Sequence, residues 1–134
     1  MYRFRVRKKW PPRRIYNEIP SGTQGIYRIY DLQKHLIYIG TSQDIRNRIR
    51  AHVYKRKSGC IGRRGHWFDF ESVSGDYSLR RVEKMELLMA ACRDEQISPK
   101  GLCNVQLPKG ARECLESRGI PIRRPRRRHR RKSQ

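Results

Sequence analysis

Two short stretches of sequence, Gly25-Ile-Tyr-Arg-Ile-Tyr30 and Leu36-Ile-Tyr-Ile-Gly40, decide the fold of this chain. Both are rich in β-branched and aromatic residues, which favour β-strands. Residues 31–34 form a turn-sized gap between them, so the pair predicts a β-hairpin. In that hairpin Tyr27 lies opposite Tyr38, and directly opposed residues share one face of a sheet. We therefore expect both phenol groups to point to the same side.

Residues 42–55 predict a helix that follows the hairpin. Ile45 and Ile49 are four residues apart and mark its buried face. Arg48 and His52 fall on the same stripe at helical spacing. An unpaired buried charge is costly, so an inward guanidinium needs a partner. We therefore expect Arg48 to point inward, toward a polar group.

The rest of the chain supplies one more strand and two more helices. Residues 67–73 predict a third strand, 79–93 a second long helix and 111–117 a short helix. By contrast, 56–65 are expected to form a basic, glycine-rich loop, and 1–20 to be irregular. Together these elements predict an α/β (α+β) fold with a small, central, mainly antiparallel three-stranded sheet flanked by helices.

The charge of the chain is strongly positive. Among 134 residues, 33 Lys and Arg against 12 Asp and Glu give a net charge of +21. Such a field attracts polyanions, of which nucleic acid is the commonest. Residues 1–14 and 119–134 are basic and contain no acid. We expect a basic arm over residues 1–18, a globular domain over 19–122 and a disordered, arginine-rich tail over 123–134.

The expected partner is DNA, with RNA as the alternative. Arginines on the first helix, in the basic loop and in the tail are the candidate phosphate contacts. These nucleic-acid-binding candidates are Arg46, Arg50, Arg63, Arg64, Arg123, Arg124, Arg126, Arg127 and Arg128. No base-reading element is visible, so sequence specificity is not expected.

No C-x-x-C pair occurs among the four cysteines, which are Cys60, Cys92, Cys103 and Cys114. Without zinc-ligand spacing or a secretion signal, we expect four reduced thiols in an intracellular protein. The longest apolar run, residues 87–92, is too short to span a bilayer, so no membrane partner is expected. The expected compartment is the cytoplasm or nucleoid, or the nucleus in a eukaryotic or viral setting. No obligate protein partner is visible.

The triplets Gly25-Ile-Tyr27 and Tyr38-Ile-Gly40, ten residues apart, resemble the paired motif of the GIY-YIG nucleases. The family pattern continues with an arginine eight positions after the second glycine, which Arg48 matches. Many members carry a histidine one turn later, which His52 matches. The family includes incision domains of bacterial excision repair and homing endonucleases, and the resemblance covers about residues 19–104.

This resemblance implies a metal-dependent endonuclease that hydrolyses DNA phosphodiester bonds with one bound Mg²⁺ or Mn²⁺. Tyr27 is then the base that activates water, and Tyr38 bonds the attacking water or a phosphate oxygen. Arg48 binds the scissile phosphate, and His52 orients water or moves a proton. A free tyrosine has a pKa of about 10, so we expect the cation and Arg48 to lower the pKa of Tyr27.

In the family, a glutamate on a later helix completes the site. The resemblance implies that this glutamate binds the metal ion. The predicted apolar stripe of helix 79–93 comprises Val82, Met85, Met89 and Ala90. Glu86 lies within this stripe, and Glu83 lies at its edge. We therefore favour Glu86 as the ligand of the cation, with Glu83 as the alternative. Zinc is not expected.

Two other functions fit parts of the sequence. A non-catalytic DNA- or RNA-binding protein built on the same domain has the same basic composition. In such a protein Arg48 pairs with a core carboxylate such as Glu86 and only holds two helices together. A zinc-stabilised interaction module, in contrast, contains stoichiometric zinc and unfolds on chelation.

Overall fold

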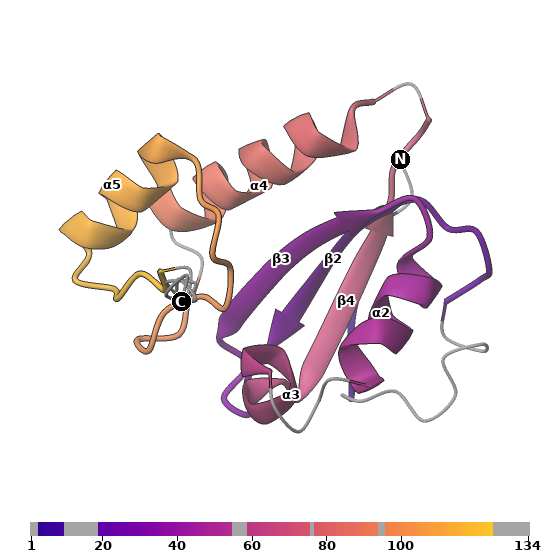
Figure 1. The fold of residues 1–134 in the computed structure, drawn as a ribbon, viewed down its shortest axis with the longest axis horizontal. Coiled ribbons are helices and arrows are strands. Elements are labelled where there is room, and N and C mark those ends of the chain that lie inside the picture. The colour runs from indigo at the N-terminus through magenta and orange to yellow at the C-terminus, as the bar shows by residue number, and fades with distance from the viewer. Residues whose placement is uncertain (1–2, 10–18, 55–58, 76, 94–95, 125–134) are drawn as a thin grey trace, which may run out of the picture.

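The computed structural model describes residues 3–9, 19–54, 59–75, 77–93 and 96–124. Within them an antiparallel β-sheet is covered by helices on both faces (Figure 1). This arrangement confirms the predicted α/β (α+β) fold. Residues 10–18 of the predicted arm and 125–134 of the predicted tail lie outside the described residues.

The sheet has the strand order β1-β4-β2-β3, with antiparallel neighbours throughout. The three predicted strands are present. They are β2 at Gly25–Tyr30, β3 at Leu36–Ser42 and β4 at Trp67–Ser72. Because β2 lies between β3 and β4, its backbone is hydrogen-bonded on both sides and its side chains have a fixed orientation.

A fourth strand was not predicted. β1 spans Arg3–Lys9 and pairs with β4. The expectation that residues 1–20 are irregular is therefore wrong for this segment. Its sequence alternates arginine with Phe4 and Val6, which is the period of a strand. The many basic residues of this segment favoured the prediction of an irregular arm. Backbone pairing with β4 does not require apolar side chains, so the strand forms despite them.

Four helices occur in the described part of the chain. They are α2 at Ile45–Tyr54, α3 at Cys60–Arg64, α4 at Leu79–Cys92 and α5 at Lys109–Ser117. The short helix α3 replaces much of the loop predicted over residues 56–65. At the start of α4 the side chain of Ser78 accepts a hydrogen bond from the backbone of Arg81, an N-cap. None of these helices is long and apolar enough to cross a bilayer.

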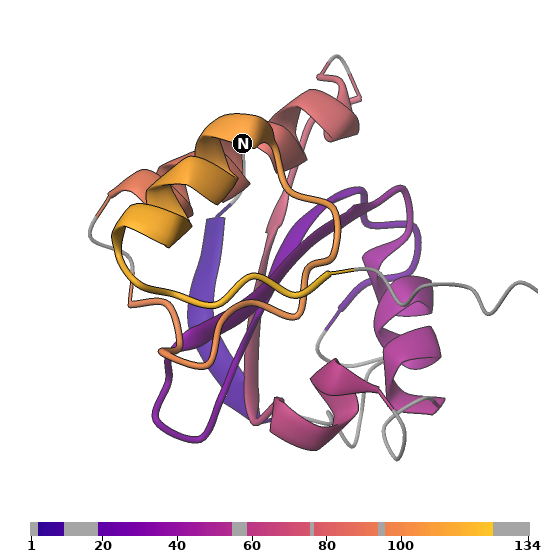
Figure 2. The ribbon, with the colours of Figure 1, turned by 60° about the vertical axis from the view of Figure 1, so that its left-hand side comes forward.

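The helices divide between the two faces of the sheet (Figure 2). On one face α2 and α3 cover a core whose members include Tyr27, Ile29, Ile49 and Phe68. On the other face α4 and α5 cover a core whose members include Ile26, Tyr30, Ile39, Leu87 and Leu115. Successive side chains of a strand point to opposite faces. Neighbouring residues of β2 therefore serve different layers of the molecule.

The buried face of α4 differs from the predicted one. Leu87, Ala90 and Ala91 are buried, whereas Met85 and Met89 are exposed by 57% and 43%. The predicted stripe is therefore wrong at both methionines. Both sets of residues have helical spacing, so periodicity could not choose between them. Contact with the sheet and α5 selects the face that carries the smaller alanine side chains.

Arg28 of β2 lies in a cluster of carboxylates on the α4 face. Its guanidinium is 2.8 Å from Glu86, 3.4 Å from Asp69 and 3.8 Å from Glu71. Asp69 and Glu71 are buried, and the hydroxyl of Tyr30 donates to Asp69 at 2.7 Å. Burial lowers the pKa of Arg28, but Glu86 and Asp69 raise it by more, so the net shift is upward. The guanidinium of Arg28 is therefore shared by three carboxylates.

The segment 96–104 covers the outer edge of β3. Leu36 and Ile97 form a parallel bridge. Further along, the Asn104 side chain accepts a hydrogen bond from the backbone N–H of Ile39 and donates one to its carbonyl. An exposed strand edge is a site for unwanted pairing. The segment 96–104 satisfies this edge with side-chain and backbone groups.

The cysteines form two disulfides, Cys60–Cys103 and Cys92–Cys114. The expectation of four reduced thiols is therefore wrong. The first bond joins α3 to the segment 96–104, and the second joins α4 to α5. The partners are 43 and 22 residues apart, so no local spacing could identify them. With all four sulfur atoms paired, none is a thiolate ligand for zinc.

Removing the cation of the carboxylate cluster should destabilise the fold. Arg28→Ala leaves two buried carboxylates without their main counter-charge, so we expect the free energy of unfolding to fall by about 3–5 kcal/mol. Urea denaturation measures this change. Arg80→Ala on the exposed surface of α4 is the control, with an expected change within about 0.5 kcal/mol. Equal losses in the two variants would show that the cluster does not stabilise the fold.

Candidate active site

The two motif tyrosines lie on neighbouring strands, but not directly opposite one another. Tyr27 pairs with Gly40, and Tyr38 pairs with Ile29, because the ladder shifts near the hairpin turn. The predicted Tyr27–Tyr38 pairing is therefore wrong by two positions on β3. Residues two apart on a strand share a face, so both phenols do lie on the same side. Their ring centroids are 5.9 Å apart.

The glycines of the two triplets allow close approaches that a side chain would block. A Cβ atom at Gly40 would lie 2.5 Å from both Cζ and Oη of Tyr27 and 2.8 Å from Cε2 of Tyr38. The Tyr27 ring can therefore lie across β3 only if position 40 has no side chain. At Gly25 a Cβ atom would collide with the backbone carbonyl of Glu71 in β4.

Helix α2 brings His52 to the phenol of Tyr27. The Tyr27 Oη atom is 2.8 Å from His52 Nε2. The ring of Tyr38 meets that imidazole edge-on, with centroids 5.4 Å apart. Tyr27 itself is fully buried. A neutral imidazole with its proton on Nδ1 accepts the hydrogen bond from the phenol.

Arg48 lies one helical turn before His52 and contacts the same two tyrosines. Arg48 is exposed, so the expectation that its side chain points inward is wrong. Hydrogen bonding and charge interactions with Tyr27, and then with Tyr38, nevertheless raise the pKa of Arg48. The long side chain therefore stays at the surface while its guanidinium faces the phenols.

The pKa of Tyr27 is shifted upward rather than downward. Burial is the largest cause, and the neighbouring phenol of Tyr38 adds to it. Hydrogen bonding to Arg48 and its positive charge lower the pKa of Tyr27, but by less. Arg48 does lower the pKa of Tyr27, as expected, but burial and Tyr38 raise it by more, so the expected net decrease is wrong. The Tyr27 phenol is therefore protonated near neutral pH, with His52 as its nearest proton acceptor.

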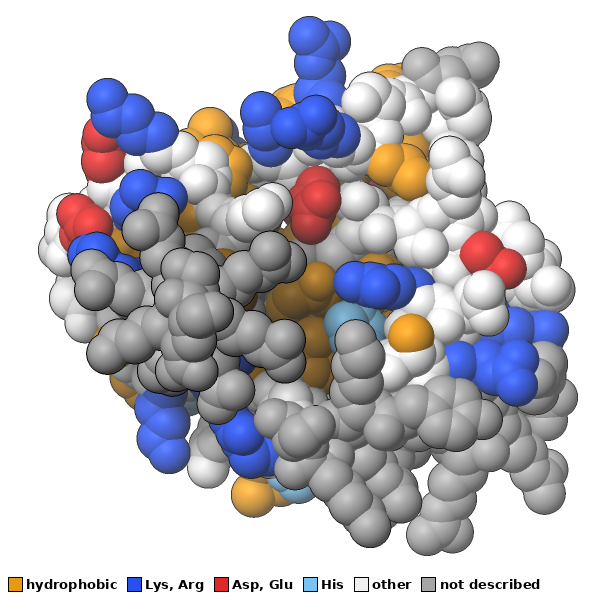
Figure 3. Space-filling view, viewed as in Figure 1, with side chains coloured by type: hydrophobic (Ala, Val, Ile, Leu, Met, Phe, Trp, Pro, Cys, Tyr) orange, Lys and Arg blue, Asp and Glu red, His pale blue; other side chains and the backbone are white. Residues whose placement is uncertain are grey.

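A cavity of about 410 Å³ opens beside these groups. One side is formed by Tyr38, Arg48 and His52, and the other by residues that include Cys60 and Arg123. Two guanidinium groups and no carboxylate occur in its lining. Figure 3 shows a hollow in this face of the molecule, with hydrophobic side chains at its floor and basic and histidine side chains at its rim. The cavity is suited to an anionic group.

Glu86 does not join this constellation. It lies on the opposite face of the sheet, where it pairs with Arg28 at 2.8 Å. Arg28 follows Tyr27 in β2, so the two side chains point to opposite faces. The expected convergence of Glu86 with Tyr27, Tyr38 and Arg48 is therefore wrong. Glu86 is a member of the structural carboxylate cluster.

Glu83 is the glutamate that lies within electrostatic reach of Arg48. The hydroxyl of Thr41, directly after the second motif glycine, donates to its carboxylate at 3.4 Å. Burial raises the pKa of Glu83, and the Thr41 hydrogen bond and the charge of Arg48 oppose that shift only in part. Glu83 lines a separate cavity of about 290 Å³ with Gln106. It thus lies at the edge of β3, within electrostatic reach of Arg48.

The donor set near Arg48 fits one divalent cation bound mainly by water and substrate. Glu83 offers two hard oxygen atoms, and a nearby cation would offset the cost of its partly desolvated charge. No cluster of three or more His, Cys, Asp or Glu side chains occurs among the residues that the structure describes. Mg²⁺ commonly binds proteins through one or two carboxylates and keeps several waters. A single glutamate is therefore a sufficient protein ligand.

The predicted nucleic-acid-binding arginines are placed in different surroundings. Arg46 donates to the carbonyl of Ile19 at 2.9 Å, and Arg50 is half-buried on the same helix. Arg63 is exposed on α3. Arg124 lines a cavity of about 280 Å³ together with Arg112 and Arg123. The predicted contacts Arg126, Arg127 and Arg128 lie outside the described residues.

Two of the predicted arginines lie close to the Cys60–Cys103 disulfide. Arg123 lines the 410 Å³ cavity and donates to the carbonyl of Cys103 at 3.4 Å. Arg64 donates to the carbonyl of Gly101 at 2.7 Å and lies 3.5 Å from the sulfur of Cys60. That Cys60 and Cys103 line the cavity could not be read from the sequence, because their proximity depends on tertiary packing.

Comparison with protein families gives one match. The model of the GIY-YIG catalytic domain matches residues 23–91. The matched range contains both tyrosines, Arg48, His52 and both candidate glutamates. A search of curated proteins and a search of solved structures found no significant match. The segment 96–124, which supplies part of the cavity wall, lies outside the matched range.

A methyl group at position 40 should disturb the Tyr27 ring. In Gly40→Ala the new Cβ overlaps Cζ and Oη of Tyr27, so the phenol has to move relative to His52. We expect the free energy of unfolding to fall by about 1–3 kcal/mol. Gly75→Ala is the control, because a Cβ there meets nothing within 4 Å. Denaturant unfolding compares the two variants, and similar stabilities would contradict the tight packing at Gly40.

Proposed function

The chain belongs to the GIY-YIG family, and from this premise we propose that it is a divalent-metal-dependent endonuclease that hydrolyses DNA phosphodiester bonds. One observation carries the proposal. On one face of the sheet the buried phenol of Tyr27 is hydrogen-bonded to His52, and His52 lines a cavity together with Tyr38, Arg48 and Arg123. Glu83, on another helix, lies within electrostatic reach of Arg48. These are the groups that phosphodiester hydrolysis needs.

Arg48 binds the scissile phosphate. Its residue is exposed at the cavity, and its guanidinium faces two phenol oxygens rather than a carboxylate. A guanidinium can donate two parallel hydrogen bonds to phosphate oxygens. The negative charge on these oxygens grows as the water attacks, so the contact is stronger in the transition state than in the ground state.

Tyr27 and His52 move the proton of the attacking water. The raised pKa of Tyr27 makes its phenolate a poor resting species. The phenol oxygen can instead accept a proton from water while its own proton passes to Nε2 of His52, 2.8 Å away. A neutral imidazole is a suitable acceptor near neutral pH. Tyr38, at the cavity wall, hydrogen-bonds the water or a phosphate oxygen.

Glu83 holds the divalent cation, and the support for this assignment is its proximity to Arg48 and Thr41. When bound, Mg²⁺ or Mn²⁺ acts as a Lewis acid that offsets negative charge on the phosphate oxygens. Glu86 stabilises the fold and takes no part in the reaction.

The competing function is a nucleic-acid-binding protein without catalysis. Its composition and net charge are the same. The exposed guanidinium at the cavity favours the enzyme, because a purely structural Arg48 would be paired with a carboxylate in the core. Burial of an acid such as Glu83 near a cationic group is also a common feature of functional sites.

A plasmid assay tests the activity. Supercoiled plasmid incubated with the purified chain should be nicked in Mg²⁺ or Mn²⁺ and stay intact in chelator. Agarose gels resolve nicked, linear and supercoiled DNA, and gel shift measures binding in parallel. Tight binding without nicking in either cation would reject the endonuclease and support the non-catalytic protein.

Two conservative substitutions distinguish the two glutamates. Glu83→Gln should reduce the nicking rate by about 100-fold or more because it removes the cation's ligand. Glu83→Gln should not lower the free energy of unfolding, because burial in the folded protein disfavours the charged form of this carboxylate and raises its pKa. Glu86→Gln should keep nicking within several-fold, yet lower the free energy of unfolding by about 1–3 kcal/mol through its contact with Arg28.

The measurements are nicking rate and urea denaturation on the same preparations. The reverse pattern, with loss of nicking in Glu86→Gln and full nicking in Glu83→Gln, would contradict the assignment of Glu83 while leaving the endonuclease itself intact.

A further inference from the structure

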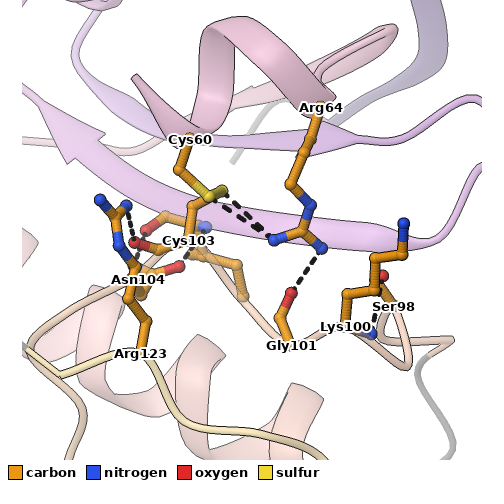
Figure 4. Close-up of a disulfide and its surroundings, with 9 residues drawn as sticks. Cys60, Arg64, Ser98, Lys100, Gly101, Cys103, Asn104 and Arg123 are labelled. Atoms are coloured by element: carbon orange, nitrogen blue, oxygen red, sulfur yellow. Dashed lines mark hydrogen bonds between the residues drawn. A yellow bond between two sulfur atoms is a disulfide. The ribbon is translucent and has the colours of Figure 1, made fainter. Parts of the chain in front are cut away.

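Three segments that are distant in sequence meet beside the candidate active site. Helix α3 is joined to the segment 96–104 by the Cys60–Cys103 disulfide. The segment 119–124 packs against the segment 96–104 so closely that a Cβ atom at Gly101 would collide with the carbonyl of Pro121. Figure 4 shows this junction, with Arg123 on one side of the disulfide and Lys100 on the other.

A second and larger cavity lies at the far side of this junction. Its volume is about 530 Å³, and its lining includes Arg63, Arg64, His66 and Lys100. The one carboxylate in the lining, Asp31, is engaged by the backbone N–H of His35 at 2.9 Å. The cavity is therefore basic, like the 410 Å³ cavity that holds Arg48 and Arg123.

Arg64 lies between the two cavities and shows that their cations are close to one another. Burial lowers its pKa, Asp31 raises it, and the positive charges of Arg123 and Arg63 lower it further. These positive charges repel one another, and an anion bound between them would offset that repulsion. One guanidinium nitrogen of Arg64 is already bound to Gly101, so this residue holds the junction together. Arg123 and Lys100, both exposed, are placed to contact a ligand.

We propose that the DNA backbone on one side of the scissile phosphate passes over the Cys60–Cys103 disulfide, from the active-site cavity into the 530 Å³ cavity. Arg123 binds the phosphate next to the scissile one, and Lys100 binds a phosphate further along the same strand. This inference rests on the proposed function for the position of the scissile phosphate. It assigns the segment 96–124, outside the matched catalytic domain, to substrate binding.

A polyanion fits this track better than a small anion or an acidic protein. The cations recur along a path that joins two cavities, and a nucleic-acid strand presents phosphates at regular spacing along its length. Phosphate contacts of this kind fix the register of the strand without reading its sequence. The track therefore positions the scissile bond over Arg48.

Two double variants with the same net charge test the track. Arg123→Ala with Lys100→Ala removes two cations from it. Arg81→Ala with Lys109→Ala removes two exposed cations from α4 and α5, at positions that line neither cavity. Affinity for a fluorescein-labelled 20-base-pair duplex is measured by anisotropy in chelator, over a range of salt concentrations. All four positions are exposed, so both proteins should fold, and circular dichroism verifies this.

The track variant should bind the duplex at least about 10-fold more weakly than the control variant, with a salt slope lower by about two. Equal losses in the two variants would overturn the track. The nicking assay separates the two proposals. If the wild-type chain nicks plasmid but both variants lose equal affinity for the duplex, the endonuclease is supported and the track is rejected. A chain that binds in the expected pattern but never nicks keeps the track and loses the endonuclease.

Discussion

The alternation of side chains along β2 is the constraint on which the rest of the structure depends. This strand is hydrogen-bonded to β3 on one side and to β4 on the other, so it cannot rotate to exchange its faces. Tyr27 therefore points to the layer of α2, and Arg28 to the layer of α4. The first placement creates the contact with His52. The second draws Glu86 into a cluster with Asp69 and makes that glutamate structural.

The proposed active site lies at the edge strand β3, where groups from the two layers come within electrostatic reach of each other. Position 40 has no side chain, so the Tyr27 ring lies across β3 toward its outer edge. Arg48 approaches from α2 and Glu83 from α4, on either side of this edge. In the middle of the sheet the strands would keep two such groups apart. The edge thus brings charged residues from opposite layers near one another.

The part of the chain beyond the matched domain completes this edge. The Asn104 side chain satisfies the backbone of β3 at Ile39, and the Cys60–Cys103 bond fixes the same segment to α3. The result is a wall that carries Arg123 beside the catalytic groups. The hairpin therefore borders a cavity whose other lining residues are far from it in sequence.

The sequence by itself determined the hairpin, the three main helices and the candidates Tyr27, Tyr38, Arg48 and His52, because strand composition, helical period and the spacing from Gly25 to His52 are local properties of the chain. Tertiary structure alone decided which surroundings Glu83 and Glu86 have, because Glu86 pairs with Arg28 whereas Glu83 lies within electrostatic reach of Arg48. Two helical faces of α4 are both partly apolar, and only packing against the sheet selects one. The strand at Arg3–Lys9 and the disulfide partners were likewise hidden, since each depends on a surface assembled from distant segments.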